Sequence, residues 1–266
     1  MDLDFNATGT KEQVLQGRTA IGEAIAAALE QHDSSYDFTY RGRYDQLTVS
    51  ARFSPLSGTA RQRLKLEVLF IERFAILGRV EHLLVPTLFD EPLTVNTYHL
   101  EELTSTKLRA LHDRRKGRDI CDLFRIADLE LNQAAVRKMV LYYFYRANKV
   151  FHYPTFVRNV ELKIAERGFR DDVRALVRHG AELDWETACQ QVLARFEFLG
   201  DLDDRDQLFL DLAKVLLGKP YPKARESFLQ EIERPLAWLM EGLPISAEAE
   251  AMTREDIKPY RPDAEA

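Results

Sequence analysis

Residues 99–124 read HLEELTSTKLRALHDRRKGRDICDLF, and this stretch constrains the fold more than any other part of the chain. Its first half has leucines at positions 100, 103 and 111, near the spacing of one face of an α-helix. The basic run RRKGR follows, and the next apolar residues again fall at helical spacing. The stretch therefore predicts two helices, over 100–115 and 118–129, joined by a basic turn around Gly117.

Lys107 occupies a position within this leucine stripe, seven residues after Leu100. A lysine in such a place either extends its ammonium group past the apolar side chains to solvent or is held by an anion. An ammonium group also matches the charge of a metal-bound triphosphate. The pattern of this helix alone does not decide whether the ammonium group lies in solvent, pairs with an anion of the protein or binds a triphosphate.

The turn after this helix concentrates positive charge in Arg114, Arg115, Lys116 and Arg118. Cations at a helix C-terminus suit the helix dipole, and the same cations suit the phosphates of a nucleotide or an RNA. Asp119 opens the next helix at the edge of its apolar face, whereas Asp122 is expected to point further into solvent. We therefore expect Asp119 to take a buried polar role and to hold Lys107 or an arginine.

The first hundred residues alternate between strand-like and helix-like patterns. A helix is expected over 11–32, and strands over 36–41, 46–53, 63–70 and 93–98, of which the second and third pair as an antiparallel hairpin. After residue 129, apolar periodicity predicts further helices over 133–149, 155–167, 170–179, 184–198, 203–217 and 223–241. We expect an α/β unit over 1–115, a helical unit over 116–242 and a loosely ordered, acidic tail over 243–266.

Two carboxylates, Asp2 and Asp4, lie in the opening segment MDLDF. Residues i and i+2 of a strand face the same side, so the two like charges repel unless a cation relieves them. Magnesium, with its preference for oxygen ligands, is the expected cation, and a frayed acidic terminus is the alternative. Glu67, which shares the strand segment KLEV with Lys65, is the candidate third carboxylate, and a solvent-exposed Lys–Glu pair is the alternative.

Composition limits the remaining classes of protein. The net charge of −6 excludes a broad nucleic-acid-binding coat but allows a local basic patch. The two cysteines form no CxxC motif, the six histidines show no metal-ligand spacing, and the P-loop, GxGxxG and GxSxG motifs are missing. Neither a signal peptide nor an apolar run long enough for a membrane span is found, so a cytoplasmic location is expected.

The stretch 99–124 strongly resembles the signature of the AbiEii/AbiGii-type nucleotidyltransferase toxins. In that family a helix of the form E-x-x-x-x-x-K-L-x-A-L leads through a basic stretch to R-D-x-x-D-L. The matching residues here are Glu102, Lys107, Leu108, Ala110, Leu111, Arg118, Asp119, Asp122 and Leu123. The segment KLEV looks like the family's strand with a lysine and an acid, and DLDF looks like the end of its first motif.

The resemblance implies an α+β fold, with a polymerase-β-like nucleotidyltransferase core followed by an all-helical C-terminal domain. It implies Mg²⁺, a nucleoside triphosphate as substrate, an RNA acceptor such as tRNA, and a cognate antitoxin with a winged-helix part. The implied metal ligands are Asp2, Asp4 and Glu67, and the implied catalytic set adds Lys107 and Asp119. Phosphate binding is expected from Lys65, Lys107, Arg114, Arg115 and Arg118.

The chain departs from the family pattern at its start. Members normally carry a Gly-Gly or Gly-Ser segment and a short helix before the Asp-x-Asp strand, and no residues precede that strand here. We therefore expect either a true start further upstream or an N-terminally truncated chain. The alternative function is that of a catalytically inactive nucleotidyltransferase-fold protein that acts as a binding or interaction module.

Overall fold

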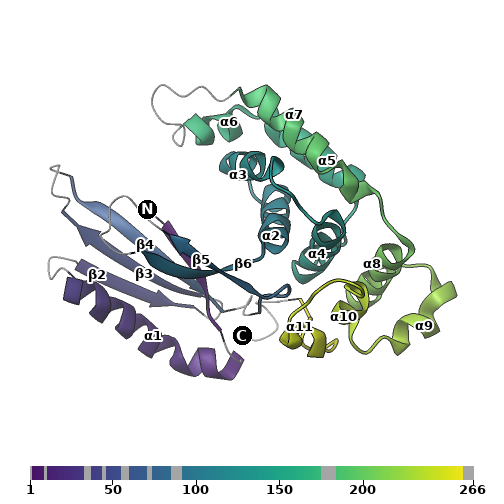
Figure 1. The fold of residues 1–266 in the computed structure, drawn as a ribbon, viewed down its shortest axis with the longest axis horizontal. Coiled ribbons are helices and arrows are strands. Elements are labelled where there is room, and N and C mark those ends of the chain that lie inside the picture. Colours follow the sequence, from purple (N-terminus) through teal and green to yellow (C-terminus); the bar gives the residue numbers. More distant parts are fainter. Residues whose placement is uncertain are drawn as a thin grey trace. The chain divides into compact units, whose positions relative to one another are not determined.

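The computed structural model describes residues 2–8, 11–32, 37–43, 46–54, 60–70, 74–84, 92–174 and 184–259 (Figure 1). The strands are β1 (Asp2–Asn6), β2 (Asp37–Gly42), β3 (Gln46–Phe53), β4 (Gln62–Leu69), β5 (Arg79–Leu84) and β6 (Leu93–Tyr98). The α-helices are α1 (Lys11–His32), α2 (Leu100–Asp113), α3 (Arg118–Ala127), α4 (Gln133–Arg146), α5 (Tyr153–Ile164), α6 (Arg167–Arg174), α7 (Trp185–Arg195), α8 (Asp204–Leu216), α9 (Glu226–Glu231), α10 (Pro235–Leu239) and α11 (Ala247–Ala251). Two 3₁₀ helices are η1 (Glu197–Gly200) and η2 (Lys223–Arg225). The mixed α+β class is as predicted.

The chain forms two compact units, which divide after Phe74 rather than after residue 115. Unit 1 spans Met1–Phe74 and unit 2 spans Ala75–Ala266. The difference arises because the segment after Phe74 is bonded to the helices that follow it. The backbone N–H group of Ile76 donates to the carboxylate of Glu102 in α2, and the Ile76 carbonyl accepts from the N–H group of Ser246. The β5–β6 hairpin therefore belongs to the helical part.

Unit 1 is a four-stranded sheet in the order β1-β4-β3-β2. Strand β1 pairs parallel to β4, and the β4–β3 and β3–β2 pairs are antiparallel. The predicted hairpin between 46–53 and 63–70 is confirmed, with Leu47 opposite Val68 and Val49 opposite Leu66. The alternation that predicted these strands has its physical cause in the pleat, which directs successive side chains to opposite faces.

Helix α1 covers one face of this sheet (Figure 1). The predicted apolar stripe of α1 supplies Val14, Ile21, Ile25 and Leu29 to the contact, whereas Ala20 is exposed. The core formed against this helix contains the buried residues Ala7, Val14, Leu47, Val49, Leu66, Val68 and Phe70. The opposite face of the sheet carries the polar residues that alternate with them.

Helix α4 packs against α2 and α8 in unit 2, and every residue of it from Lys138 to Tyr145 is buried. The dense aromatic run that begins in this helix is core, with Phe144 in contact with Phe151 and Phe156. The helices predicted between 100 and 217 are present with ends that differ by a few residues, except that positions 175–179 of the helix predicted over 170–179 lie outside the described part of the chain. The helix predicted over 223–241 is divided into η2, α9 and α10, because Pro235 ends the preceding structure and starts a new helix.

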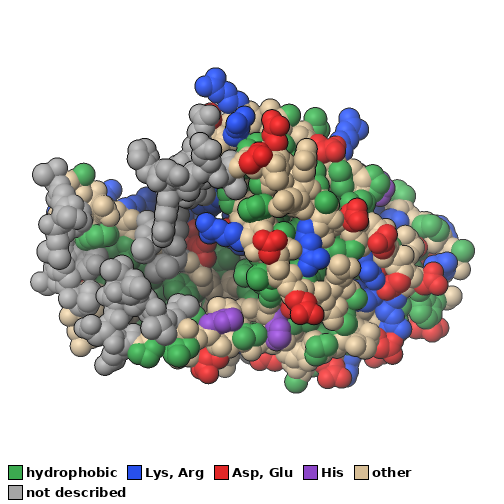
Figure 2. All heavy atoms as spheres, turned by 45° about the horizontal axis from the view of Figure 1, so that its top comes forward, with side chains coloured by type: hydrophobic (Ala, Val, Ile, Leu, Met, Phe, Trp, Pro, Cys, Tyr) green, Lys and Arg blue, Asp and Glu red, His purple; other side chains and the backbone are tan. Residues whose placement is uncertain are grey.

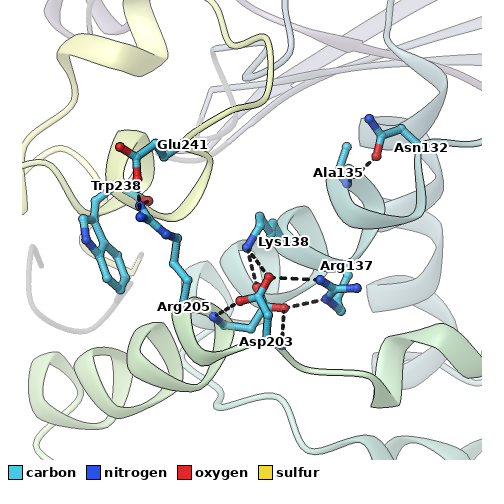
Figure 3. A network of polar contacts seen from close by, with 9 residues as sticks. Asn132, Ala135, Arg137, Lys138, Asp203, Arg205, Trp238 and Glu241 are labelled. Carbon is cyan, nitrogen blue, oxygen red and sulfur yellow. Dashed lines mark hydrogen bonds and ion pairs between the residues drawn. The ribbon is translucent and has the colours of Figure 1, made fainter.

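A buried ionic network joins α4 to the start of α8 (Figure 3). The Lys138 ammonium donates to Asp206 Oδ1 at 2.8 Å, and Arg137 Nε donates to Asp206 Oδ2 at 2.5 Å. Asp203 accepts from the same two cations and forms a capping box with Asp206 at the N-terminus of α8. Two cations thus neutralise two carboxylates and satisfy the helix end, which suits a structural role.

The segment 243–259 is more regular than the loosely ordered tail that its composition predicts. It forms α11 and buries Ala249, Met252 and Ile257. Its backbone is also held by Arg146, which donates to the carbonyl groups of Asp256 and Lys258. Apolar residues spaced among the acidic ones explain the difference, and residues 260–266 lie outside the described part of the chain. Over the described residues, every helix is too short or too polar to cross a membrane.

Candidate active site

A carboxylate and a Lys–Glu pair lie side by side on neighbouring strands of unit 1. The parallel pairing of β1 with β4 places Asp4 opposite Glu67, and Asp2 opposite Lys65. Partners on neighbouring strands leave the sheet on the same face, so Asp4 and Glu67 project from one side. This side faces away from α1, because the buried Leu66 alternates with Lys65 and Glu67 along β4. The backbone thus brings the DLDF and KLEV segments together, while the Asp2 side chain lies outside the described part of the chain.

The Glu67 carboxylate is oriented by two neighbours. Its Oε2 atom lies 2.6 Å from Lys65 Nζ, and its Oε1 atom accepts from Gln46 Nε2 at 3.0 Å. Gln46 also donates to Thr48 Oγ1 at 3.0 Å, so the amide is fixed from a second direction. The side chains of Lys65 and Glu67 keep 32% and 22% of their surface in contact with solvent. The carboxylate is therefore held in place and compensated by a cation, yet still reached from solvent.

The carboxylates on this face of the sheet fit a hard divalent cation. Asp4 and Glu67 supply carboxylate oxygens, which are the ligands that magnesium prefers. Among the described residues, no three His, Cys, Asp or Glu side chains come close enough together to hold a metal ion. Asp4 and Glu67 are thus two of the three predicted ligands, and the third, Asp2, is the one whose side chain is not described.

Lys107 in α2 is held by an anion, and that anion is Asp122. Lys107 Nζ donates to Asp122 Oδ2 at 2.6 Å, from α2 to α3. Of the two partners expected for Asp119, Lys107 or an arginine, the lysine is thus not the one observed. The expectation that Asp122 points further into solvent is wrong, because Asp122 lies on the side of α3 that faces α2 and pairs with Lys107. The predicted leucine stripe is also shifted: Leu103 is 36% exposed, and the buried apolar residues of α2 are Leu108 and Leu111.

Asp119 has the buried polar role predicted for it, with an arginine as its partner. Its side chain is fully buried, and both of its oxygens accept from the Arg114 guanidinium, at 2.9 Å from Nε and 2.7 Å from Nη2. A two-point arginine–carboxylate pair fixes both position and orientation. The ion pair between Arg114, at the start of the basic turn, and Asp119, near the start of α3, therefore links the two ends of this turn.

The other basic residues of this turn are exposed. Arg115 keeps 74% of its side-chain surface and contacts Glu166 at 3.5 Å, and Arg118 is exposed at the start of α3. On the part of the surface visible in Figure 2, Lys and Arg side chains are interspersed with Asp and Glu side chains rather than gathered into one basic face. Among the three predicted phosphate-binding arginines, Arg115 and Arg118 are thus accessible, while Arg114 is committed to Asp119.

Lys163 of α5 holds the C-terminus of α2 and the start of the basic turn in place, a role that no sequence pattern predicted. Its ammonium donates to the carbonyl groups of Leu111, His112 and Arg114, and so caps the C-terminus of α2. Burial lowers the pKa of Lys163, against the attraction of Asp113. The sequence signal that could have identified Lys163 as buried is its helical spacing from two core residues of α5, Phe156 and Val160.

Gly117 lets α6 approach the basic turn. A Cβ atom at this position would lie 2.0 Å from the carbonyl oxygen of Phe169 and 2.7 Å from Val173 Cγ2, both in α6. Its φ of −58° is open to any residue, so the requirement is for space alone. The glycine in RRKGR therefore has a packing role.

Glu102, the first residue of the family-like pattern in α2, is also structural. It is fully buried, and its carboxylate accepts from the N–H groups of Ile76 and Leu77 at 2.9 Å and from the Tyr143 hydroxyl at 2.7 Å. A buried carboxylate needs such donors to offset its lost hydration. Glu102 therefore fixes the segment that enters β5 to the helices of unit 2.

Comparisons with known proteins identify the family of the chain and a structure with a shared fold. A profile of the family described as the nucleotidyl transferase AbiEii toxin of type IV toxin–antitoxin systems matches residues 1–196, well over half of the chain. The chain is similar to the structure of MenT4, a nucleotidyltransferase toxin from Mycobacterium tuberculosis H37Rv, with 22% identity and a TM-score of 0.54 over 77% of this chain and 70% of that one. It is also similar to JHP933 from Helicobacter pylori, with 16% identity and a TM-score of 0.41 over 75% of each chain. No curated protein sequence matches the chain. The likeness to MenT4 shows a shared fold.

Proposed function

Because the chain belongs to the AbiEii family of nucleotidyl transferase toxins of type IV toxin–antitoxin systems, we propose that it transfers a nucleotide from a nucleoside triphosphate to RNA, with tRNA as the acceptor class. In this reaction the acceptor hydroxyl attacks the α-phosphorus, the bond to the pyrophosphate breaks, and the nucleotide stays on the acceptor. A cognate antitoxin with a winged-helix part is the proposed protein partner.

The observation that carries the proposal is the pairing of Asp4 with Glu67 across β1 and β4, beside Lys65. We propose that these carboxylates, with Asp2, hold Mg²⁺. When bound, the metal ion compensates negative charge on the reacting phosphates. Gln46 orients Glu67 through its hydrogen bond, and Lys65 supplies a positive charge beside the carboxylate, which reduces the repulsion between neighbouring acids.

In unit 2, we propose that Lys107 contacts a phosphate of the nucleotide. Its pairing with Asp122 fixes the ammonium group, and 29% of the side chain remains accessible. Arg115 and Arg118 add exposed positive charge in the turn that follows, and the Asp119–Arg114 pair holds that turn in shape. Asp119 is thus a positioning residue in this proposal.

The test measures transfer of label from a mixture of the four α-³²P-labelled nucleoside triphosphates to bulk tRNA, with and without Mg²⁺. The variants are Asp4→Asn and Lys107→Ala. Lys214→Ala is the matched control, because Lys214 pairs with Asp211 at 2.9 Å and has the same side-chain exposure as Lys107, 29%. Circular dichroism checks that each variant is folded.

We expect transfer to require Mg²⁺ and to fall on the order of 100-fold in each of the two variants, since each removes a group that acts on developing charge. The control should keep the activity of the unchanged chain. Full activity in both Asp4→Asn and Lys107→Ala would refute the assigned roles. A folded chain that transfers no nucleotide to any RNA would instead favour a binding or interaction module.

A further inference from the structure

The face of the unit 1 sheet that carries the carboxylates becomes basic toward β2. The strand register aligns Asp4, Glu67, Thr48 and Arg41 in one row across β1, β4, β3 and β2. Arg43 follows Arg41 by two residues and continues on the same face, opposite Gln46, whose carbonyl accepts from the Arg43 N–H group at 2.7 Å. Acidic residues thus stand at one end of the row and arginines at the other.

Side chains and backbone of β2, β3 and β4 line an open pocket on this part of the sheet. The lining residues are Thr39, Tyr40, Arg41, Arg43, Gln46, Thr48, Ser50, Arg63, Lys65 and Glu67. Four of them are cations and one is a carboxylate, although the whole chain carries a net charge of −6. Guanidinium and hydroxyl groups in one place are the donors that proteins use to bind phosphate oxygens.

The basic end of this pocket is held in shape by two contacts that do not involve the guanidinium groups of Arg41 and Arg43. Arg63 Nη2 donates to Ser50 Oγ at 2.7 Å, and Arg18 of α1 donates from Nη1 to the carbonyl of Arg43 at 2.7 Å. The Arg18 side chain passes close to Gly42, where a Cβ atom would lie 3.0 Å from Arg18 Nε. Within the described part of the chain, Arg41 and Arg43 are exposed and form no ion pair.

We propose that Arg41 and Arg43 bind the phosphodiester backbone of the acceptor RNA. The inference rests on the proposed function, because it is the acceptor that has to reach the carboxylates. Neighbouring strands are about 4.8 Å apart, which places the Arg41 backbone roughly 10 Å from Glu67 and roughly 14 Å from Asp4. A phosphodiester backbone that begins at the carboxylates spans this distance, whereas a single phosphate group held by the carboxylates covers only part of it.

The test measures binding of a labelled single-stranded oligoribonucleotide, and separately of nucleoside triphosphates with Mg²⁺, by fluorescence anisotropy and calorimetry at several salt concentrations. The double variant is Arg41→Gln/Arg43→Gln. The matched control is Lys223→Gln/Arg225→Gln, which removes two exposed cations at the same sequence spacing in η2 of unit 2. Both double variants change the net charge equally.

We expect the Arg41→Gln/Arg43→Gln variant to bind the oligoribonucleotide on the order of tenfold more weakly and to lose about 1.4 from the slope of log K against log salt, roughly 0.7 for each phosphate contact. Triphosphate binding should not change, and the control should behave as the unchanged chain does. Unchanged RNA affinity and salt slope would overturn the inference, as would an equal loss of triphosphate binding, which assigns the arginines to the nucleotide. The two proposals fail separately. If the unchanged chain transfers no nucleotide, the proposed function is refuted, while the binding measurements still decide whether Arg41 and Arg43 bind RNA.

Discussion

Gly117→Ala is the sharpest test of how the basic turn is built. The new Cβ atom would lie 2.0 Å from the Phe169 carbonyl oxygen, and its nearest neighbours are in α6, including Val173. Helix α6 has to move by about 1 Å before this contact reaches even 3.0 Å, a distance that is already tight. Such overpacking costs about 1–3 kcal/mol, so the free energy of unfolding of unit 2 should fall by that amount.

Tryptophan fluorescence during urea unfolding measures this effect selectively. Both tryptophans of the chain, Trp185 and Trp238, belong to unit 2. Trp185 packs against Phe169 itself, with ring centroids 5.8 Å apart, so its emission reports the displaced helix directly. We expect a lower urea midpoint with an unchanged slope, since the surface exposed on unfolding stays the same.

Gly168→Ala is the matched control, because it makes the same chemical change one residue before Phe169. A Cβ atom there meets nothing within 4 Å, and the residue lies within α6. Alanine at such a position stabilises by roughly 0.4–1 kcal/mol, so the two substitutions should have opposite signs. A Gly117→Ala variant that is as stable as the unchanged chain would refute the close approach of α6 to the turn.

Two further predictions concern the C-terminal end of α2, which leads into the basic turn. Burial raises the pKa of Asp113, but hydrogen bonds from His112 and Lys149 and the charges of Lys149 and Arg109 outweigh it and lower the pKa from 3.8 to about 2. The folded state therefore binds this proton more weakly than the unfolded chain, so the stabilisation is present above pH about 4 and is lost as the pH falls through about 2. Asp113→Asn should flatten the acid limb of the unfolding free energy, and an acid limb of unchanged steepness would contradict this. Lys163→Met removes the ammonium cap and should cost about 1.5–3 kcal/mol and speed amide exchange in residues 111–118, measured by mass spectrometry; unchanged exchange there would show that the cap is dispensable.

Local patterns were sufficient to predict most of the elements. The alternation of 46–53 and 63–70 predicted both strands and their pairing, because one face of each is buried against α1. Strand β5 was missed, because its sequence, RVEHLL, lacks clean alternation and its partner β6 lies across a long connection. The unit boundary was misplaced for a related reason: it depends on the bonds from Glu102 to Ile76 and Leu77, which no local pattern reports.

The candidate site shows the same division between local and distant information. The side of the sheet on which Asp4 and Glu67 lie follows from alternation, and Asp119 as the buried acid follows from its place at the edge of an apolar helix face. The partners do not follow from such patterns. The sequence places two acids, Asp119 and Asp122, in the helix after Lys107, and only the packing of α2 against α3 selects Asp122 as its partner.

The sequence by itself determined the strands, the helices, the candidate acids and the family pattern, because each depends on residue types at fixed local spacing. Only the tertiary structure decided that Asp4 stands beside Glu67, that Lys163 caps α2, and that Gly117 makes room for α6. Those facts depend on which elements pack together. Packing is set by the sum of many contacts between residues far apart in the chain, and no single segment contains that information.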